Sequence, residues 1–317
     1  MYVNGMLMNK KDEKNNIKDD NSYSAQTISI FKDLEAVRVR PGMYIGDLAY
    51  ATQQMLYEIL DNSVDELVCG YGDYINITIQ GDRYIIEDNG RGIPVDIHPT
   101  EGIPAVELIL TKLHAGGKFG NSNYKFSGGL HGVGASDVNA LSEYFKCTVF
   151  KNQQMYIIEF SKGKVIKPLY NLPTDRKTNG TIIEFIPDYS IVTPYIIPKD
   201  ILINRFTELV YLNSKLKITL NYDDVNKTFQ STNGLLEYIN VLGGNILYKI
   251  CDFSEHLDIV VAWSNKNTSK IECFCNNIKQ SNGGTHFAAL KNGLFKCISK
   301  YIEDNLNKNI EIISDDI

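Results

Sequence analysis

One short stretch of the chain carries a carboxylate, an amide and a second carboxylate at the spacing of a helix. Glu58, Asn62 and Asp65 stand at positions i, i+4 and i+7, which places them on one face of a helix. An amide oxygen can bind Mg²⁺, which keeps several waters and takes its other ligands from phosphate. A carboxylate one turn away could take the proton of a water that attacks a γ-phosphate. The alternative is the solvated face of an amphipathic helix, which most such stripes form.

Two glycine clusters follow that could hold phosphate groups. They are His114–Lys118 (HAGGK) and Ser127–Gly134 (SGGLHGVG). Glycine lets backbone N–H groups approach an anion closely, and the second cluster leads into a predicted helix, whose N-terminus attracts phosphate. Lys118 adds a positive charge to the first cluster. The alternative is a flexible surface loop. Neither a P-loop motif nor a dinucleotide-binding glycine motif occurs in the chain to support another phosphate-binding fold.

Asp88 is a further candidate for ligand binding. It follows a predicted strand and precedes Gly90 and Gly92, so it stands at a tight turn. A buried carboxylate there could accept a hydrogen bond from an exocyclic amine and so select adenine over guanine. The alternative is an ordinary Asp-Asn-Gly turn, which is a frequent use of these residues.

Hydrophobic periodicity predicts the elements that would position these residues. Helices are expected at 52–68, 104–114, 136–141, 233–241 and 286–305, and strands at 75–79, 84–87, 145–151, 154–160, 181–186, 257–263 and 270–276. The strands at 145–151 and 154–160 would form a hairpin around Asn152-Gln153. Helices and antiparallel strands that come in blocks, without regular βαβ repetition, indicate an α+β layered fold.

The composition is that of a globular protein. With 317 residues, of which 43% are hydrophobic and 22% charged, the chain can bury a core without disulfides and suggests two domains or one large one. The six cysteines show no C-x-x-C pair, so we expect reduced thiols and no zinc site. No apolar run reaches the ~20 residues that span a bilayer. We therefore expect a cytoplasmic protein, or one in an equivalent reducing space, with no membrane partner.

The N-terminal segment and the net charge limit what the protein can bind. Residues 1–21 are polar and lack periodicity, so we expect a disordered tail. The net charge is −6. A protein that grips duplex DNA as its main task usually carries a basic excess, because neutralising phosphates dominates that affinity. Contact with duplex DNA would therefore be local, transient or made through a partner.

Taken together, four motifs resemble the GHKL ATPase superfamily, which includes gyrase and topoisomerase IV B subunits, chaperones, mismatch-repair proteins and histidine kinases. In order and spacing the motifs are Glu58-x-x-x-Asn62, Asp88-x-Gly90-x-Gly92, Gly128–Gly134 and Gly180-Thr181. The alternatives given above for single motifs do not explain four motifs in register. The resemblance implies the GHKL (Bergerat) layered sandwich, with ATP and Mg²⁺ as cofactors.

Within this superfamily the chain resembles the bacterial type IIA DNA topoisomerase B subunits, over roughly residues 22–317. The segments that carry this likeness are Arg40–Gly46 (RPGMYIG), Val95–Pro99 (VDIHP), Leu113–Phe119 (LHAGGKF), Asn276-Asn277 and Gly283–His286 (GGTH). The likeness implies a GHKL ATPase domain at 22–226 with an N-terminal dimerisation arm, then a truncated ribosomal-S5-like transducer domain at 227–317. Ile103–Leu110 and Tyr124–Gly129 resemble topoisomerase IV more than gyrase, which stays the alternative.

The resemblance assigns roles to individual residues. Glu58 would be the general base and Asn62 the Mg²⁺ ligand. Asp88 would bind the adenine amine, with Thr181 beside it. Tyr23, in the arm, would reach into the nucleotide site of the partner, so that ATP binding drives homodimer formation. The other ATP-binding residues would be Asp65, Gly92 and Tyr124, with Gly116, Gly117, Lys118, Leu130, His131, Gly132, Val133 and Gly134 around the phosphates. Val64, Ile93, Pro94 and Ile109 would line the adenine pocket, with Glu66 and Arg91 at its mouth, where competitive inhibitors of the family also bind.

The implied function is an ATP-driven clamp. ATP binding would close a dimer around a DNA segment and hydrolysis would reopen it, which drives strand passage (decatenation or relaxation) together with a topoisomerase A subunit. The chain stops at Ile317, before the glutamine-threonine-lysine loop that contacts the γ-phosphate in this family. We therefore expect a fragment that binds ATP and turns it over poorly. A nucleotide-binding module without turnover is the alternative, which the presence of Glu58 disfavours. Arg40–Gly46 and Gly283–His286 disfavour a chaperone or a mismatch-repair protein.

Two positions depart from the family pattern. Gln54 stands where many relatives have a histidine that can hydrogen-bond the catalytic glutamate, so the base would be oriented differently or more weakly. Lys151 stands where an arginine is expected. Lysine lacks the planar fork of arginine, and we therefore predict weaker aminocoumarin binding.

Overall fold

The structure is a computed structural model that describes residues 31, 33–116, 132–243, 245–254, 256–265, 270–306 and 312. The tail predicted for residues 1–21 lies outside this range.

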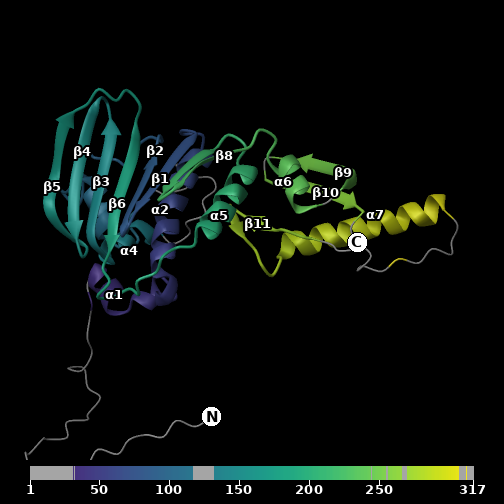
Figure 1. Cartoon of the computed structure of the whole chain (residues 1–317), viewed down its shortest axis with the longest axis horizontal. Helices are drawn as coiled ribbons and strands as arrows, with labels where there is room; N and C mark the ends of the chain where they lie inside the picture. Colours follow the sequence, from purple (N-terminus) through teal and green to yellow (C-terminus); the bar gives the residue numbers. More distant parts are fainter. Residues whose placement is uncertain are drawn as a thin grey trace, which may run out of the picture. The chain divides into compact units, whose positions relative to one another are not determined.

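An eight-stranded sheet forms the main layer, in the order β5-β4-β3-β6-β2-β1-β7-β8 (Figure 1). Its strands are β1 Tyr74–Gln80, β2 Arg83–Asp88, β3 Ser142–Lys151, β4 Gln154–Ser161, β5 Lys164–Pro173, β6 Gly180–Pro187, β7 Lys217–Tyr222 and β8 Val225–Gln230. β1 and β7 run parallel, and the other neighbouring pairs are antiparallel. A mostly antiparallel sheet covered by helices confirms the predicted α+β layered fold.

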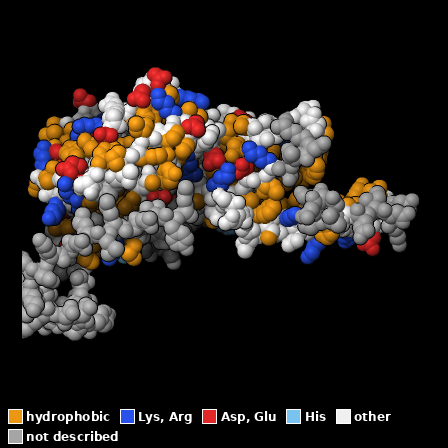
Figure 2. Space-filling model, turned by 60° about the horizontal axis from the view of Figure 1, so that its bottom comes forward, with side chains coloured by type: hydrophobic (Ala, Val, Ile, Leu, Met, Phe, Trp, Pro, Cys, Tyr) orange, Lys and Arg blue, Asp and Glu red, His pale blue; other side chains and the backbone are white. Residues whose placement is uncertain are grey.

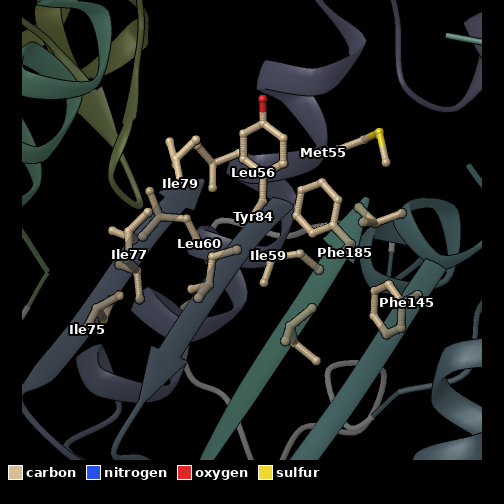
Figure 3. Packing of buried hydrophobic residues seen from close by; sticks show 14 of the residues in the cluster. Met55, Leu56, Ile59, Leu60, Ile75, Ile77, Ile79, Tyr84, Phe145 and Phe185 are labelled. Carbon is tan, nitrogen blue, oxygen red and sulfur yellow. The ribbon is translucent and has the colours of Figure 1, made fainter. Parts of the chain in front are cut away.

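Helix α2, Ala51–Val68, lies on this sheet and matches the helix predicted for 52–68. Its apolar side is fully buried, at Met55, Leu56, Ile59, Leu60 and Val64. Figure 3 shows side chains of this helix, among them Leu56, Ile59 and Leu60, packed near Ile75, Ile77 and Ile79 of β1 and Tyr84 of β2. The helix ends before Gly70, whose φ of 86° suits a left-handed residue after a helix C-terminus.

Four further helices belong to this region, and all but the last are short: α1 Leu34–Val39, α3 Ala105–Thr111, α4 Gly134–Ala140 and α5 Lys199–Leu212. α4 and α5 contact the sheet, whereas α1 and α3 pack against α4. Two 3₁₀ turns, Pro41–Met43 and Leu48–Tyr50, connect α1 to α2. α3 is shorter than the helix predicted for 104–114, because the backbone is already extended at Lys112. α4 begins two residues before the predicted start at Ser136.

The hairpin predicted around Asn152-Gln153 is confirmed. Lys151 pairs with Gln154, and the two residues between them have φ of 52° and 59°. Positive φ at both positions is typical of a two-residue turn of type I′, whose twist matches that of the strands.

Several strands and one helix were not predicted from periodicity. β5 contains Pro168 and Pro173 and lies at an edge of the sheet, where one side is solvated. β8 forms the other edge and is largely polar. α5 was also missed, although Leu202, Phe206, Leu209 and Val210 bury one side of it.

The C-terminal region follows β8 and contains α6 Leu235–Leu242, β9 Ile246–Phe253, β10 Asp258–Ser264, β11 Phe274–Cys275, β12 Ile278–Lys279 and α7 Thr285–Asn305. β9 pairs with β10, and β11 pairs with β12. The strand predicted for 270–276 is therefore only two residues long, and β9 was missed. α7 agrees with the helix predicted for 286–305.

The surface and the thiols agree with the composition. Figure 2 shows basic and acidic side chains interspersed over the face in view. All six cysteines are free, as predicted. None of the helices in the described ranges is long and apolar enough to cross a membrane.

Candidate active site

The polar stripe of α2 does not face bulk solvent. Glu58 and Asn62 are half-buried, and Asp65 is only 2% exposed. A solvated face would leave these side chains exposed, because burying a carboxylate costs free energy. The observed burial therefore does not fit a solvated face. The alternative interpretation of the stripe is therefore wrong.

The carboxylate of Glu58 meets the start of α4. A Cβ built on Gly134 would lie 2.0 Å from Oε2 of Glu58 and 2.9 Å from its Cδ. Just before the helix, Gly132 has a φ of 62°, a conformation that glycine adopts without strain. In the second cluster, Gly132 thus allows a turn of the backbone, and Gly134 allows the backbone to approach Glu58 closely. The end of this cluster therefore lies next to Glu58.

A second carboxyl lies close to Glu58. Asp137, one turn further along α4, is 2% exposed. Its Oδ1 finds no hydrogen-bond partner within the described part of the chain. Burial, and then the negative charge of Glu58, raise the pKa of Asp137 to about 7. Sequence reasoning missed this residue, and the available signal was an acidic residue among Val138 and Ala140 on a buried helix.

Asp88 sits at the end of β2 as a buried acceptor. Its Oδ1 accepts hydrogen bonds from the backbone N–H of Gly90 (2.9 Å) and of Thr181 (3.3 Å). Its Oδ2 accepts one from the hydroxyl of Ser63 (3.0 Å). Burial raises the pKa of Asp88 to about 6, and these hydrogen bonds oppose the rise. Since a carboxylate has about four acceptor positions, Oδ2 keeps room for one more donor.

The glycines around Asp88 are required by close packing. A Cβ on Gly180 would lie 2.2 Å from the carbonyl oxygen of Asp88, and one on Gly90 would lie 2.4 Å from Cγ of Glu66. Gly92 has a φ of 76° and leaves no room for a Cβ beside Val149. An ordinary turn would not need three such contacts, so the turn alone does not explain this motif.

Glu66 and Arg91 form an ion pair. Nε and one terminal nitrogen of Arg91 donate to the two carboxylate oxygens of Glu66, at 2.7 and 2.9 Å. The guanidinium also lies 3.6 Å from the ring centroid of Tyr71. A forked pair with a stacked ring has a fixed geometry. Its place at the mouth of an adenine pocket stays a prediction.

The residues predicted to line the adenine pocket differ in exposure. Val64 is buried in the core, whereas Ile93 and Ile109 are half-buried and Pro94 is exposed. Ile93 packs against the core with its covered side. Half-buried apolar residues are the ones that could still contact a ligand.

Part of the predicted ATP-binding set lies outside the described residues, namely Tyr23, Gly117, Lys118, Tyr124, Leu130 and His131. Gly116 is exposed, with open space around its Cα. The roles of these residues stay predictions.

Sequence reasoning also missed two residues around Asp88. Ser63 holds Oδ2, and its position on the buried side of α2 was the only signal. Arg176 donates to Glu87 (2.7 Å) and to the carbonyl oxygen of Asp88 (3.4 Å), and its guanidinium lies 4.2 Å from the ring centroid of Phe150. Nothing in the local sequence around residue 176 points to this contact.

The donor set suits a magnesium ion that arrives with a nucleotide. No group of three or more His, Cys, Asp or Glu side chains that could hold a metal occurs among the residues with a described placement. A metal at Asn62 would therefore take most of its ligands from waters and phosphates, as Mg²⁺ commonly does.

This fold and site define a class, the ATPase domains described as histidine kinase-, DNA gyrase B-, and HSP90-like, whose family pattern matches residues 48–190. A second family, described as DNA gyrase B, matches residues 218–317. The crystal structure of the 43K ATPase domain of Thermus thermophilus gyrase B in complex with an aminocoumarin superposes with a TM-score of 0.75 at 32% identity, covering 88% of this chain and 75% of that one. The chain belongs to the family of bacterial type IIA topoisomerase B subunits.

The curated relatives agree. The DNA gyrase B protein of Helicobacter pylori (strain J99) is 44% identical over 311 residues, and that of Campylobacter jejuni is 42% identical over 309 residues. Each alignment covers 93% of this chain and 40% of the relative, so the chain spans about two fifths of their length. The predicted GHKL sandwich with a transducer-like region is confirmed.

Proposed function

We propose that this chain binds ATP with Mg²⁺ and hydrolyses it, as the ATPase part of a type IIA topoisomerase B subunit. The observation that carries the proposal is the contact between the Glu58 carboxylate and Gly134. This contact brings the acidic stripe of α2 next to the end of the second glycine cluster. A triphosphate held by the backbone N–H groups of that cluster would therefore lie beside the stripe.

Adenine recognition is assigned to Asp88. Three donors already fix its carboxylate, and one acceptor position remains on Oδ2. An exocyclic amine fits that position, whereas the carbonyl of guanine would face a carboxylate. Thr181 lies beside Asp88 in the neighbouring strand and is the second residue of this contact.

The phosphates and the metal are assigned to Asn62 of α2 and to the two glycine clusters. Asn62 would be the protein ligand of Mg²⁺, which neutralises charge on the phosphates when it is bound. Gly132, Val133 and Gly134 would offer backbone N–H groups, together with Gly117, Lys118, Leu130 and His131. Asp65, Gly92, Gly116 and Tyr124 complete the proposed ATP-binding set, with Glu66, Arg91, Ile93, Pro94 and Ile109 around the base.

Glu58 would act as the general base that accepts the proton of the attacking water. Gln54, four residues earlier, is exposed, whereas Asp137 is buried close to Glu58. The carboxyl of Asp137 therefore lies within electrostatic reach of the proposed base, where many relatives have a histidine at position 54 instead. The fixed donors and the missing Cβ at Gly134 are consistent with a preorganised site.

The clamp and its partners follow from the family. Tyr23 would enter the site of a second copy on ATP binding, and the closed dimer would enclose a DNA segment transiently, with a topoisomerase A subunit cutting the second segment. We divide the chain into an ATPase domain at 22–226 and a transducer domain at 227–317. Because β8 of the ATPase-domain sheet spans Val225–Gln230, the boundary proposed at 226 falls inside this strand, and the end of the sheet favours a boundary after Gln230. Competitive inhibitors would bind at the mouth formed by Glu66 and Arg91.

Phosphate release by the wild-type chain and by Glu58→Ala tests the proposal. The variant should lose about 10²-fold or more of the activity while still binding a non-hydrolysable ATP analogue. Equal background rates in the two proteins would favour a binding module without turnover. In sedimentation, the analogue should convert the chain to a dimer, and a monomer at saturating analogue would contradict the clamp.

Two candidate reactions remain within the family. The relatives named above are gyrase B proteins, whereas Ile103–Leu110 and Tyr124–Gly129 resemble topoisomerase IV. The full-length protein, combined with its A subunit, separates them: ATP-dependent negative supercoiling of relaxed plasmid identifies gyrase, and decatenation without supercoiling identifies topoisomerase IV.

A further inference from the structure

Arg205 of α5 lies where three distant segments of the chain meet. One terminal nitrogen of its guanidinium donates to the carbonyl oxygen of Asn277, at 2.7 Å. The other donates to Oδ1 of Asp61 in α2, at 3.0 Å. The side chain is only 13% exposed, so both contacts are largely shielded from water. Charge-assisted hydrogen bonds in such a place hold their geometry.

Asp61 belongs to the helix that carries the proposed catalytic groups. It stands directly before Asn62 and three residues after Glu58, inside the 18-residue helix α2. Within one helix neighbouring residues move together, because each is fixed by main-chain hydrogen bonds to the next turn. A small rotation or shift of α2 on nucleotide binding would therefore displace the acceptor that Arg205 contacts.

Asn277 belongs to the tight turn between β11 and β12. Asn276 and Asn277 have φ of 47° and 69°, which is typical of a two-residue type I′ turn and explains two consecutive asparagines. The side chain of Asn277 accepts a hydrogen bond from Asn213 at the C-terminal end of α5, at 2.8 Å. Hydrogen bonds from Arg205 and Asn213 thus hold the turn to α5, and Arg205 also reaches α2 through Asp61.

A second link holds the same hairpin to α5 without reaching α2. Lys279 of β12 forms ion pairs with Glu208 of α5, at 3.4 Å, and with Glu272. Both links cross the same junction, which also contains the ring contacts of Tyr238 with Tyr211 and Phe274. Lys279 therefore offers a matched control for Arg205.

We propose that Arg205 is a positioning residue that couples the nucleotide site to the transducer region through the path Asp61–Arg205–Asn277. The planar fork serves two acceptors at once, which a lysine cannot do at fixed geometry. The inference rests on the proposed function and deepens it by naming a regulatory connection of that site. Coupling of this kind is reciprocal, so the turn must in return influence nucleotide affinity.

Hydrogen exchange in the segment 272–281 tests the coupling, with and without a non-hydrolysable ATP analogue and Mg²⁺. The wild-type chain should show a nucleotide-dependent change in exchange of about 3-fold or more at the turn. Arg205→Lys should abolish this change and alter the affinity for the analogue by about 5-fold, the typical size of such a coupling. Lys279→Met should lower the thermal stability of the junction but keep the nucleotide-dependent change.

The possible outcomes separate the proposed coupling from the proposed function. A full response in Arg205→Lys, an equal loss in Lys279→Met, or no response at the turn of a wild-type chain that does bind the analogue would overturn the coupling and leave the proposed function standing. If calorimetry detects no binding of the analogue to the wild-type chain, the proposed function fails first. Additive effects of Asp61→Asn and Arg205→Lys in a double-mutant cycle would also contradict the path.

Discussion

The carboxylate of Glu58 lies so close to Cα of Gly134 that a methyl group there would come within 2.0 Å of Oε2. The two residues are 76 positions apart and belong to different helices, α2 and α4, which pack against each other. Glycine at 134 is thus required by the place of the proposed base as well as by the approach of an anion. The same contact fixes where the base can point.

Gly134→Ala should reduce catalysis more than binding. The added methyl group must displace the Glu58 carboxylate, and a positioned general base contributes roughly 10²–10⁴-fold. We expect kcat for phosphate release to fall by about 10²-fold, while the affinity for an ATP analogue changes by less than about 3-fold. Gly293→Ala is the control, since that helical glycine has open space around it. Unchanged kcat in Gly134→Ala would remove Glu58 from the mechanism.

Asp88→Asn should weaken ATP binding in a pH-dependent way. The pKa of Asp88 is raised to about 6, so the wild-type carboxylate is ionised at pH 8 and mostly protonated at pH 5. A hydrogen bond to a charged group is worth about 1.5–3 kcal/mol, and we expect at least tenfold weaker binding in the variant at pH 8. The difference should narrow toward pH 5, where the wild type loses its charged acceptor.

Calorimetric titration of both proteins at the two pH values provides the measurement. Taking the ratio of the two affinities cancels the protonation of the nucleotide itself. A ratio that stays constant between pH 5 and pH 8 would contradict a direct contact between the carboxylate and the base. Loss of selectivity against GTP in Asp88→Asn is the accompanying expectation.

Local sequence patterns predicted the elements whose residues carry their own periodicity or turn signal. The elements that were missed depend on packing against segments far away in the sequence. Helix α2, strand β1 and the Asn152-Gln153 hairpin each carry a complete periodicity or turn signal within their own residues. β5 and β8 do not, because an edge strand is defined by its neighbour and tolerates proline and polar residues.

The same division applies to the site. Glu58 and Asp88 could be predicted because spacing and motif order mark them. Ser63 and Asp137 could not, since their importance comes from the packing of α2 against β2 and of α4 against α2. A buried polar residue has no sequence signature of its own until the neighbouring element is placed.

Asp137→Asn should stabilise the protein above neutral pH. The pKa of Asp137 is about 7 in the folded state and near 3.8 in the unfolded chain, so the folded state holds the extra proton between these values. Stability from this group is therefore present at low pH and lost as pH rises toward 7. We expect the variant to gain about 2 kcal/mol relative to wild type between pH 5 and pH 8.

Chemical denaturation of both proteins at pH 5 and pH 8 measures this difference. The comparison should be repeated in Glu58→Gln, where the neighbouring charge is absent and the gain should be smaller. An equal effect of Asp137→Asn at the two pH values would mean that the carboxyl does not titrate in this range. A loss of stability at both would mean that the carboxyl makes a favourable contact instead.

Lys151→Arg should strengthen aminocoumarin binding. Lys151 is the last residue of β3 and is half-buried, in the strand next to Gly180 and Thr181 of β6. An arginine there would present a planar fork with two parallel donors to a ligand carbonyl, whereas lysine offers one rotatable donor. One additional well-placed hydrogen bond is worth about 1 kcal/mol, and we expect an affinity gain of about 5- to 10-fold by calorimetry. Lys146→Arg, earlier in the same strand and paired with Glu184, controls for the general effect of a guanidinium. Equal affinity in the wild type and Lys151→Arg would show that this position does not limit the interaction.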